Sequence, residues 1–253
     1  MDDKINKIDP IIIIQARMGS TRLPGKVMEK INGIPLIGYQ IKRLQESQLK
    51  IVVATPDNGQ NKELIKYVQS LGVQTFEGDT FNVLKRFYDV ALYFGANDII
   101  RITGDNPLID GSFIKEQVNK VKLNSNRYYF SEGSNKRLPL GGSFEMFSFD
   151  ILKEAFDNAK SNEEFEHVTP YMVQNLPRDI NHYLMDLDID SHHIRLTIDT
   201  VEDLKLFKIL IESYHADTLN VYEIIELFNK DKELLLINNN VNQIKVRNLT
   251  DEK

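Results

Sequence analysis

The sequence of 253 residues contains no cysteine, which excludes disulfide bridges, thiolate metal sites and cysteine nucleophiles. The sequence also has no excess of positive charge: 31 basic and 37 acidic residues give a formal net charge of −6, so an extended nucleic-acid-binding surface is not expected. No apolar run approaches the roughly 20 residues that span a bilayer, and the opening "MDDKINKIDP" lacks the apolar core of a signal peptide. These absences predict a soluble cytoplasmic protein that neither binds nucleic acid nor inserts into a membrane.

Apolar runs and amphipathic stretches alternate along the first half of the chain. Hydrophobic residues make up 42% of the sequence, enough for the core of one large domain. Strands are predicted at 11–14, 50–55, 73–78 and 97–103, and helices at 34–47, 61–72, 81–95 and 112–124. This order predicts an α/β fold with a mostly parallel twisted sheet and helices on both faces. Ligands bind such sheets beyond the carboxyl ends of the strands.

The second half is less regular and predicts a small α+β excursion. Strands are expected at 127–131, 143–148 and 194–199, helices at 149–160, 163–175, 201–213 and 220–229, a loop at 134–142 and an extended segment at 179–188. Helix caps are expected at Thr80, at Asp110 or Ser112, and at Thr200. Residues 235–253 are expected to form an edge strand, a partner contact or a loose tail.

The loop "QARMGSTRLPGK" at 15–26 follows the first buried strand and is about twice the usual length for such a connection. It combines two glycines, two hydroxyl side chains and three cations: Gly19, Gly25, Ser20, Thr21, Arg17, Arg22 and Lys26. Glycines let backbone amides turn toward one point, and arginine and lysine bind phosphate oxygens. The loop therefore predicts a triphosphate cradle, although it matches neither the Walker A nor the GxGxxG spacing. The alternative is a solvated connection with scattered charges.

Two aspartates follow predicted buried strands. "IIRITGDNPLID" places Asp105 just beyond a strand and next to Gly104, and "IRLTIDTVEDL" places Asp199 in the same way. Hard carboxylate oxygens at this edge of a sheet suit Mg²⁺, which usually shares substrate phosphates. The alternatives are that Asp105 forms a turn or caps the next helix, and that Asp199 is itself a helix cap.

At these residues the sequence resembles the CMP-sugar synthetases, cytidylyltransferases that activate sialic-acid-like and KDO-like sugar acids, and most of all their spore-coat polysaccharide branch, the SpsF type. The string "IIIIQARMGSTRLPGKVMEKINGIPLIGYQIKRL" carries the resemblance, with "GDTFNVLKRFYDVA", "RITGDNPLID", "FEMFSFDILKEA", "EHVTPYM" and "RLTIDTVEDL". It spans position 11 to about 210. It implies a Rossmann-like nucleotidyltransferase fold, CTP as donor, Mg²⁺, and often a homodimer.

The resemblance implies a set of site residues. Arg22, Lys26 and Asp105 would be catalytic, and Asp105 and Asp199 would hold the metal. Nucleotide-binding residues would be Gln15, Ala16, Arg17, Gly19, Ser20, Thr21, Arg22, Lys26, Thr80 and Gly104, with the base read by segments 13–17 and 78–84. The whole chain, 1–253, is expected to be one nucleotidyltransferase domain, with 127–190 binding the acceptor and forming the dimer.

Acceptor-binding residues are expected at Lys136, Arg137, Glu145 and His167. Lys136 and Arg137 lie in a flexible basic loop suited to clamping an anion, and the alternative is a solvated hairpin tip. For His167 the alternative is a structural hydrogen bond. The expected reaction transfers CMP from CTP to an anionic acceptor in surface polysaccharide synthesis. A different nucleotidyltransferase, a glycosyltransferase, or a non-catalytic nucleotide-sugar-binding protein remain as alternatives.

Overall fold

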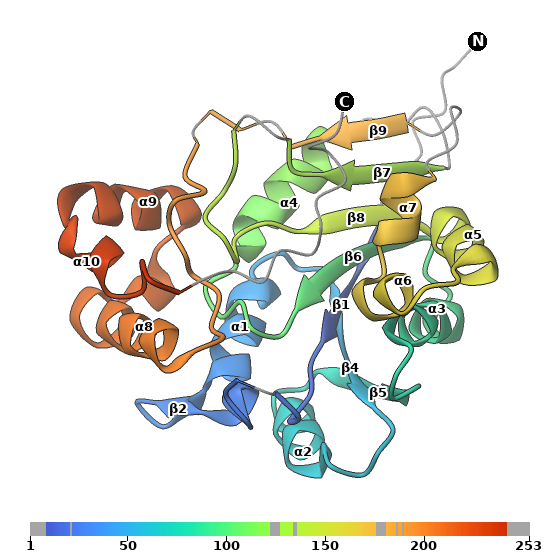
Figure 1. The fold of residues 1–253 in the computed structure, drawn as a ribbon, viewed down its shortest axis with the longest axis horizontal. Helices are drawn as coiled ribbons and strands as arrows, with labels where there is room; N and C mark the ends of the chain where they lie inside the picture. Colours follow the sequence, from blue (N-terminus) through green and yellow to red (C-terminus); the bar gives the residue numbers. More distant parts are fainter. Residues whose placement is uncertain are drawn as a thin grey trace.

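A seven-stranded sheet runs through the part of the chain that the computed structural model describes, which comprises residues 9–20, 22–121, 127–133, 136–175, 181–185, 187–188 and 190–241 (Figure 1). The strands are β1 (Ile11–Gln15), β4 (Lys50–Pro56), β5 (Gln74–Gly78), β6 (Asp98–Thr103), β7 (Tyr128–Ser131), β8 (Glu145–Ser148) and β9 (Asn181–Leu184), in the order β5-β4-β1-β6-β8-β7-β9. The strands β5, β4, β1 and β6 are parallel, whereas β8 is antiparallel to both of its neighbours. The predicted mostly parallel sheet is confirmed.

The four isoleucines of β1 show why this strand is central. Ile12 and Ile14 pack into the hydrophobic core on one face of the sheet, and Ile11 and Ile13 pack into the core on the other. Successive side chains of a strand point to opposite faces, so a solid apolar block is required where both faces are covered. Polar residues begin at Gln15, where the strand ends.

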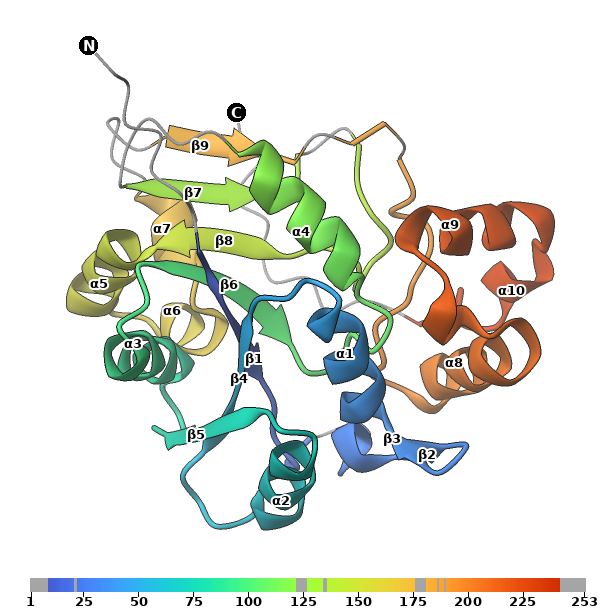
Figure 2. The same cartoon turned by 180° about the vertical axis from the view of Figure 1, so that it is seen from behind.

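Helices cover both faces of the sheet (Figures 1 and 2). One face carries α1 (Leu36–Gln45), α2 (Lys62–Ser70) and α4 (Gly111–Lys120), and the other carries α3 (Val83–Phe94), α5 (Phe149–Asn158), α6 (Asn162–His167) and α7 (Pro170–Gln174). A further helical group, α8 (Val201–Tyr214), α9 (Val221–Lys230) and α10 (Glu233–Leu236), lies beside the first face. None of the described helices is both long and apolar enough to cross a bilayer.

Short elements that the apolar periodicity does not predict connect these layers. They are the 3₁₀ turns η1 (Lys26–Met28) and η2 (Ala216–Thr218) and the two-stranded hairpin β2 (Lys30–Ile31) and β3 (Ile34–Pro35). Two predicted caps are confirmed, since Asp110 accepts from the N–H of Phe113 and Thr200 accepts from the N–H of Asp203. The predicted Thr80 cap is wrong, because α3 begins later and Asn82 accepts from the N–H of Lys85.

Two elements of the second half differ from the prediction. The expected strand at 194–199 forms only an isolated bridge between Leu140 and Arg195, because its backbone bonds to a loop: the N–H of Leu140 donates to the Ile194 carbonyl at 2.8 Å. The expected helix at 163–175 is divided at Val168, whose φ of 70° is left-handed and strained for a β-branched residue. Pro170 then begins α7, at a position where a missing N–H costs nothing.

The predicted loose tail at 235–253 is wrong for its first part. Leu235 and Leu236 belong to α10, and the buried Asn238 donates to the Arg195 carbonyl at 3.2 Å and to the Asp203 carboxylate at 2.9 Å. Residues 242–253 lie outside the described residues. The first part is therefore attached to the segment that carries Asp199.

Candidate active site

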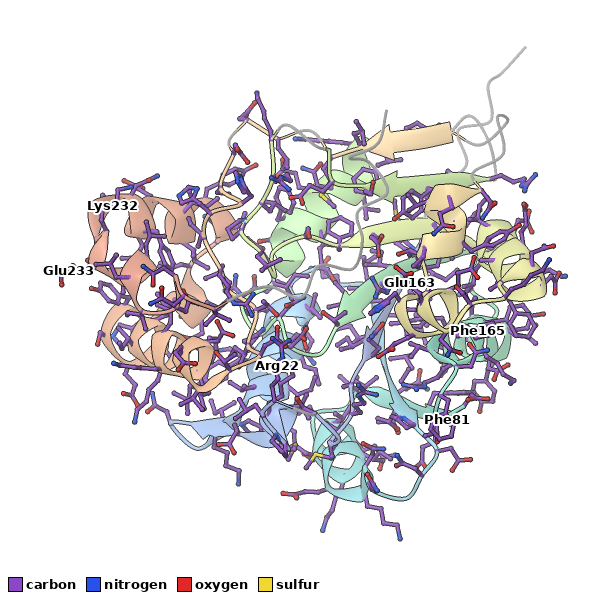
Figure 3. The ribbon with its side chains drawn as sticks, viewed as in Figure 1. Arg22, Phe81, Glu163, Phe165, Lys232 and Glu233 are labelled. Atoms are coloured by element: carbon purple, nitrogen blue, oxygen red, sulfur yellow. The ribbon has the colours of Figure 1, made fainter. Side chains whose placement is uncertain are left out.

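A cavity of about 320 Å³ opens at the carboxyl ends of β1 and β6. It is lined by Gln15, Ala16, Arg17, Ser20, Arg22, Lys26, Val27, Val83, Arg86, Arg101, Thr103, Gly104, Asp105, Glu166, His167 and Asp199. Figure 3 shows Arg22 between the sheet and the α8–α10 helices, far from Lys232 and Glu233 at the outer edge. This is where a parallel sheet is expected to bind a ligand.

The loop after β1 folds back on itself, which brings its last residue next to the strand it left. The carbonyl of Met18 accepts from the N–H of Ser20 at 3.0 Å and from the N–H of Gly25 at 2.9 Å. Gly25 has a φ of 71°, a conformation that glycine adopts without strain. Lys26 then starts η1 and projects into the cavity. Thr21, a predicted nucleotide-binding residue, lies outside the described residues.

Gly104 permits the close approach of the ends of β1 and β6. A Cβ atom at this position would lie 2.9 Å from the Cβ of Ala16 and 3.0 Å from the carbonyl oxygen of Gln15. The N–H of Gly104 donates to that carbonyl at 2.9 Å. The glycine therefore holds Asp105, the next residue, beside the loop that carries Lys26.

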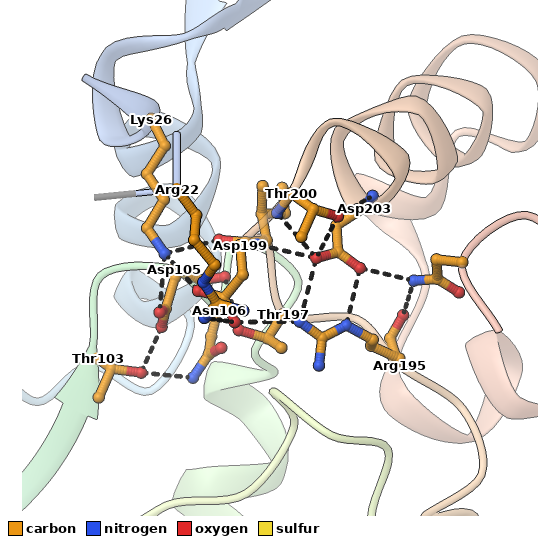
Figure 4. A network of polar contacts seen from close by, with 12 residues as sticks. Arg22, Lys26, Thr103, Asp105, Asn106, Arg195, Thr197, Asp199, Thr200 and Asp203 are labelled. Atoms are coloured by element: carbon orange, nitrogen blue, oxygen red, sulfur yellow. Dashed lines mark hydrogen bonds and ion pairs between the residues drawn. The ribbon is translucent and has the colours of Figure 1, made fainter. Parts of the chain in front are cut away.

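Lys26 joins the two predicted metal-binding aspartates (Figure 4). Its Nζ donates to Oδ2 of Asp105 at 3.1 Å, to Oδ1 of Asp199 at 2.8 Å and to the carbonyl of Ile198 at 2.7 Å. These aspartates lie 79 and 173 residues beyond Lys26 in the sequence. The structure thus brings together three of the residues that the sequence singled out, at one point of the cavity.

Asp199 lies between three cations. Its Oδ2 is 3.1 Å from Nη2 of Arg22 and 3.0 Å from Nη2 of Arg195, in addition to the contact of Oδ1 with Lys26. Burial raises the pKa of Asp199. The hydrogen bond and charge of Lys26 and the charges of the two arginines lower it by more than burial raises it, so the pKa lies below its ordinary value. The carboxylate is therefore ionised and available to a cation at neutral pH.

Arg195 and Asp203 form a buried ion pair behind Asp199 (Figure 4). The Nε of Arg195 donates to Oδ1 of Asp203 at 2.8 Å and its Nη2 to Oδ2 at 3.1 Å, and the Asp203 side chain is 0% exposed. Asp203 also accepts from the backbone N–H groups of Asp199 and Thr200 at 2.9 and 3.0 Å. The pair fixes both the backbone and the side chain of Asp199.

The cavity lining also contains Arg86 and Arg101. Arg86 is 3% exposed and donates from Nε and Nη2 to the carbonyl of Asp79, at 3.1 and 2.9 Å. Burial, and then the charge of Arg17, lower the pKa of Arg86 to about 10, so it is protonated at neutral pH. Arg101 pairs with Glu145 at 2.7 Å. Neither arginine stands out in the sequence, because each lies within an apolar helix or strand pattern.

The family model for cytidylyltransferases matches residues 11–241. The chain belongs to the cytidylyltransferase family. It is therefore a CTP-dependent nucleotidyltransferase, as the resemblance carried by the motifs at 15–26, 101–110 and 195–204 implies.

Relatives of this cytidylyltransferase align along most of its length. An uncharacterized protein of Methanocaldococcus jannaschii is 36% identical over 94% of this chain and 98% of its own. The spore coat polysaccharide biosynthesis protein SpsF of Bacillus subtilis is 29% identical over 89% of this chain and 96% of its own. A solved cytidylyltransferase from Leptospira borgpetersenii superimposes with a TM-score of 0.83 at 27% identity, covering 94% of this chain and 100% of that one.

The predicted acceptor residues of the cytidylyltransferase are divided between the cavity and its surroundings. His167 and the neighbouring Glu166 line the cavity, just before the strained backbone of Val168. Glu145 lies one layer behind, where its carboxylate accepts from Arg101 and from the hydroxyl of Tyr129. These two predicted residues are thus linked to the cavity wall by direct contact or through Arg101.

The remaining predicted residues lie outside the cavity lining. Lys136 and Arg137 are in the loop before β8, where the Arg137 carbonyl accepts from the N–H of Ser191 at 2.7 Å. The carbonyl of Thr80 lies 3.5 Å from Nη2 of Arg86, and Gly19 is exposed. An acceptor that contacts Lys136 or Arg137 would therefore extend beyond the described cavity.

Proposed function

We propose that this cytidylyltransferase transfers CMP from CTP to a hydroxyl group of a sugar acid or a related anionic acceptor, in the synthesis of a surface polysaccharide. The observation that carries the proposal is the meeting of Lys26, Arg22, Asp105 and Asp199 at one end of a cavity. The printed name of SpsF supports the polysaccharide context, and the resemblance of the motifs to CMP-sugar synthetases supports a sugar acid.

The site residues fit a Mg²⁺ ion. Asp105 and Asp199 present carboxylate oxygens to a single cationic group, the Nζ of Lys26, and Mg²⁺ prefers hard oxygen ligands. The described residues contain no group of three or more Asp, Glu, His or Cys side chains that could hold a metal ion, so the remaining ligands would be other oxygens, among them substrate phosphates and water. When bound, the ion would neutralise phosphate charge and polarise the α-phosphate.

The cationic side chains would position and neutralise the triphosphate. Arg22, whose side chain is 38% exposed, would donate to the β- and γ-phosphate oxygens and stabilise the departing pyrophosphate. Lys26 would bind the same phosphates as a mobile point charge. Glu166 and His167 would face the acceptor from the wall formed by α6. In-line attack of the acceptor oxygen on the α-phosphorus forms the new P–O bond as the bond to pyrophosphate breaks.

A nucleotide panel tests the proposal. Purified protein is incubated with CTP, UTP, GTP or ATP, with Mg²⁺ or EDTA, and with KDO or N-acetylneuraminate, and pyrophosphate release is measured. We expect release with CTP and Mg²⁺ and one class of sugar acid only. A preference for UTP would support a different nucleotidyltransferase, and tight CTP binding without turnover would support a binding protein. We also propose that the protein forms a homodimer, which sedimentation velocity would test.

A further inference from the structure

Three oxygen atoms converge on the ammonium group of Lys26, and only two of them belong to carboxylates. The third is the backbone carbonyl of Ile198, at 2.7 Å the nearest of the three to Nζ. A lysine ammonium has three N–H donors, so each donor has one oxygen. Three oxygens around one positive charge are a set of ligands that a protein could supply to a metal cation, with the other ligands coming from substrate or water.

Each of the two carboxylates has an inner oxygen that faces Lys26 and an outer oxygen that contacts other side chains (Figure 4). The outer oxygen of Asp105, Oδ1, accepts from the hydroxyl of Thr103 at 2.6 Å. The outer oxygen of Asp199, Oδ2, is held by Arg22 and Arg195. The inner oxygens, Oδ2 of Asp105 and Oδ1 of Asp199, are directed at Lys26. The inner oxygens are therefore aimed at one point by groups other than Lys26.

The Ile198 carbonyl is also fixed independently of the lysine. The N–H of Ile198 donates to the carbonyl of Asp105 at 2.9 Å, which ties the two acidic segments together. The backbone of the next residue, Asp199, is held by Asp203. The three oxygens thus belong to a rigid frame, whereas Lys26 reaches them on a flexible four-carbon stem.

From this geometry we infer that Lys26 is a tethered placeholder in a three-oxygen metal site made by Asp105, Asp199 and the Ile198 carbonyl, and that Mg²⁺ enters only when CTP draws the lysine away. The inference rests on the proposed Mg²⁺-dependent reaction. The three oxygens lie 2.7–3.1 Å from Nζ, so the ammonium group fills the space that a Mg²⁺ ion bound by them would occupy. The same space cannot hold both cations.

The exchange couples the metal to the nucleotide. Free Mg²⁺ must displace an ammonium group that has all three of its hydrogen bonds, and the displaced charge gains no new anionic partner. Mg²⁺ that arrives with CTP supplies phosphate oxygens for Lys26 beside the cation it replaces. Nucleotide and metal therefore increase each other's affinity, by the same factor in both directions.

Metal binding to the nucleotide-free protein tests the inference. Free Mn²⁺ is titrated by electron paramagnetic resonance against wild type, Lys26→Met and Lys42→Met. The last is a matched control, because Lys42 is 64% exposed and its nearest acidic partner, Asp217, is 3.8 Å away. We expect wild type and Lys42→Met to bind Mn²⁺ weakly, and Lys26→Met to bind it about tenfold more tightly or better.

A double variant locates the gain, since Asp105→Asn added to Lys26→Met should abolish it. Wild type should gain Mn²⁺ affinity when CTP is added, and Lys26→Met should gain less. Equal Mn²⁺ affinity of nucleotide-free wild type and Lys26→Met would overturn the inference. Lys26→Gln repeats the measurement if Lys26→Met does not fold. Absence of pyrophosphate release from CTP with every sugar acid would instead refute the proposed function, so the two failures are distinguishable.

Discussion

Replacing Asp203 with alanine should destabilise the protein strongly, although the residue does not line the cavity. Its side chain is 0% exposed and accepts from Arg195, from Asn238 and from two backbone N–H groups. The substitution leaves the Arg195 guanidinium, with a side chain 9% exposed, without its bidentate partner. Among the described residues, the Arg195 side chain then keeps only its contact with Asp199, at 3.0 Å, and its Nε loses its carboxylate acceptor. Removal of one member of a buried ion pair costs about 3–5 kcal/mol. That is a large share of the roughly 5–15 kcal/mol that stabilises a typical domain.

Urea denaturation followed by circular dichroism measures this loss. The matched control is Glu202→Ala, which removes an exposed carboxylate from the same first turn of α8 and should change the free energy of unfolding by less than about 0.5 kcal/mol. We expect Asp203→Ala to lose about 3–5 kcal/mol. A loss below about 1 kcal/mol, with an unchanged dependence on urea, would show that the contact with Asp199 is enough for Arg195 and that the buried pair with Asp203 contributes little to stability.

Three further predictions concern individual side chains. Arg22→Ala should lower kcat on the order of 10²-fold by removing a donor to the leaving pyrophosphate; a loss below about threefold would indicate a structural arginine. Asp105→Asn should abolish turnover while keeping the circular dichroism spectrum and urea midpoint of wild type; normal steady-state activity would rule out its metal role. Burial raises the pKa of Glu132 from 4.5 to about 7, so the folded protein holds a proton that the unfolded chain has released in this range. Wild-type stability should therefore fall as pH rises from 4.5 to 7, and Glu132→Gln should remove up to about 3 kcal/mol of this pH dependence in urea melts at pH 5 and 8. If the free energy of unfolding changed equally with pH in wild type and Glu132→Gln, the raised pKa of Glu132 would be contradicted.

The architecture was predictable from sequence where burial leaves a periodic signal. A strand covered on both faces must be apolar throughout, as residues 11–14 are, and the helix caps Asp110 and Thr200 use side chains with a specific chemistry. The prediction failed at 194–199, where an alternating pattern is satisfied by packing against a loop instead of a strand. It failed at Val168 because the strain there is imposed by tertiary contacts.

The site was predictable only in part. A loop rich in glycine and cations and an aspartate after a buried strand are local patterns, so Lys26 and Asp105 could be found from neighbouring residues. Arg195 and Asn238 could not, because their roles come from contacts made across the fold: Asn238 reaches Arg195 from 43 residues away. The sequence does not distinguish a buried arginine that pairs with a carboxylate, as Arg195 does, from one that donates to a carbonyl, as Arg86 does.

The charges of this network can stay balanced both before and after CTP binds. Three cations, Lys26, Arg22 and Arg195, are matched by three carboxylates, Asp105, Asp199 and Asp203, so the network is neutral before substrate arrives. Arg195 is committed to Asp203 by two hydrogen bonds and stays. Arg22 is held by one ion pair with Asp199 and Lys26 by three hydrogen bonds on a flexible stem, and the triphosphate would offer each a multiply charged anionic partner. In the proposed exchange, their departure would uncover Asp105 and Asp199 where Mg²⁺ would bind, so neither carboxylate would be left without a cation.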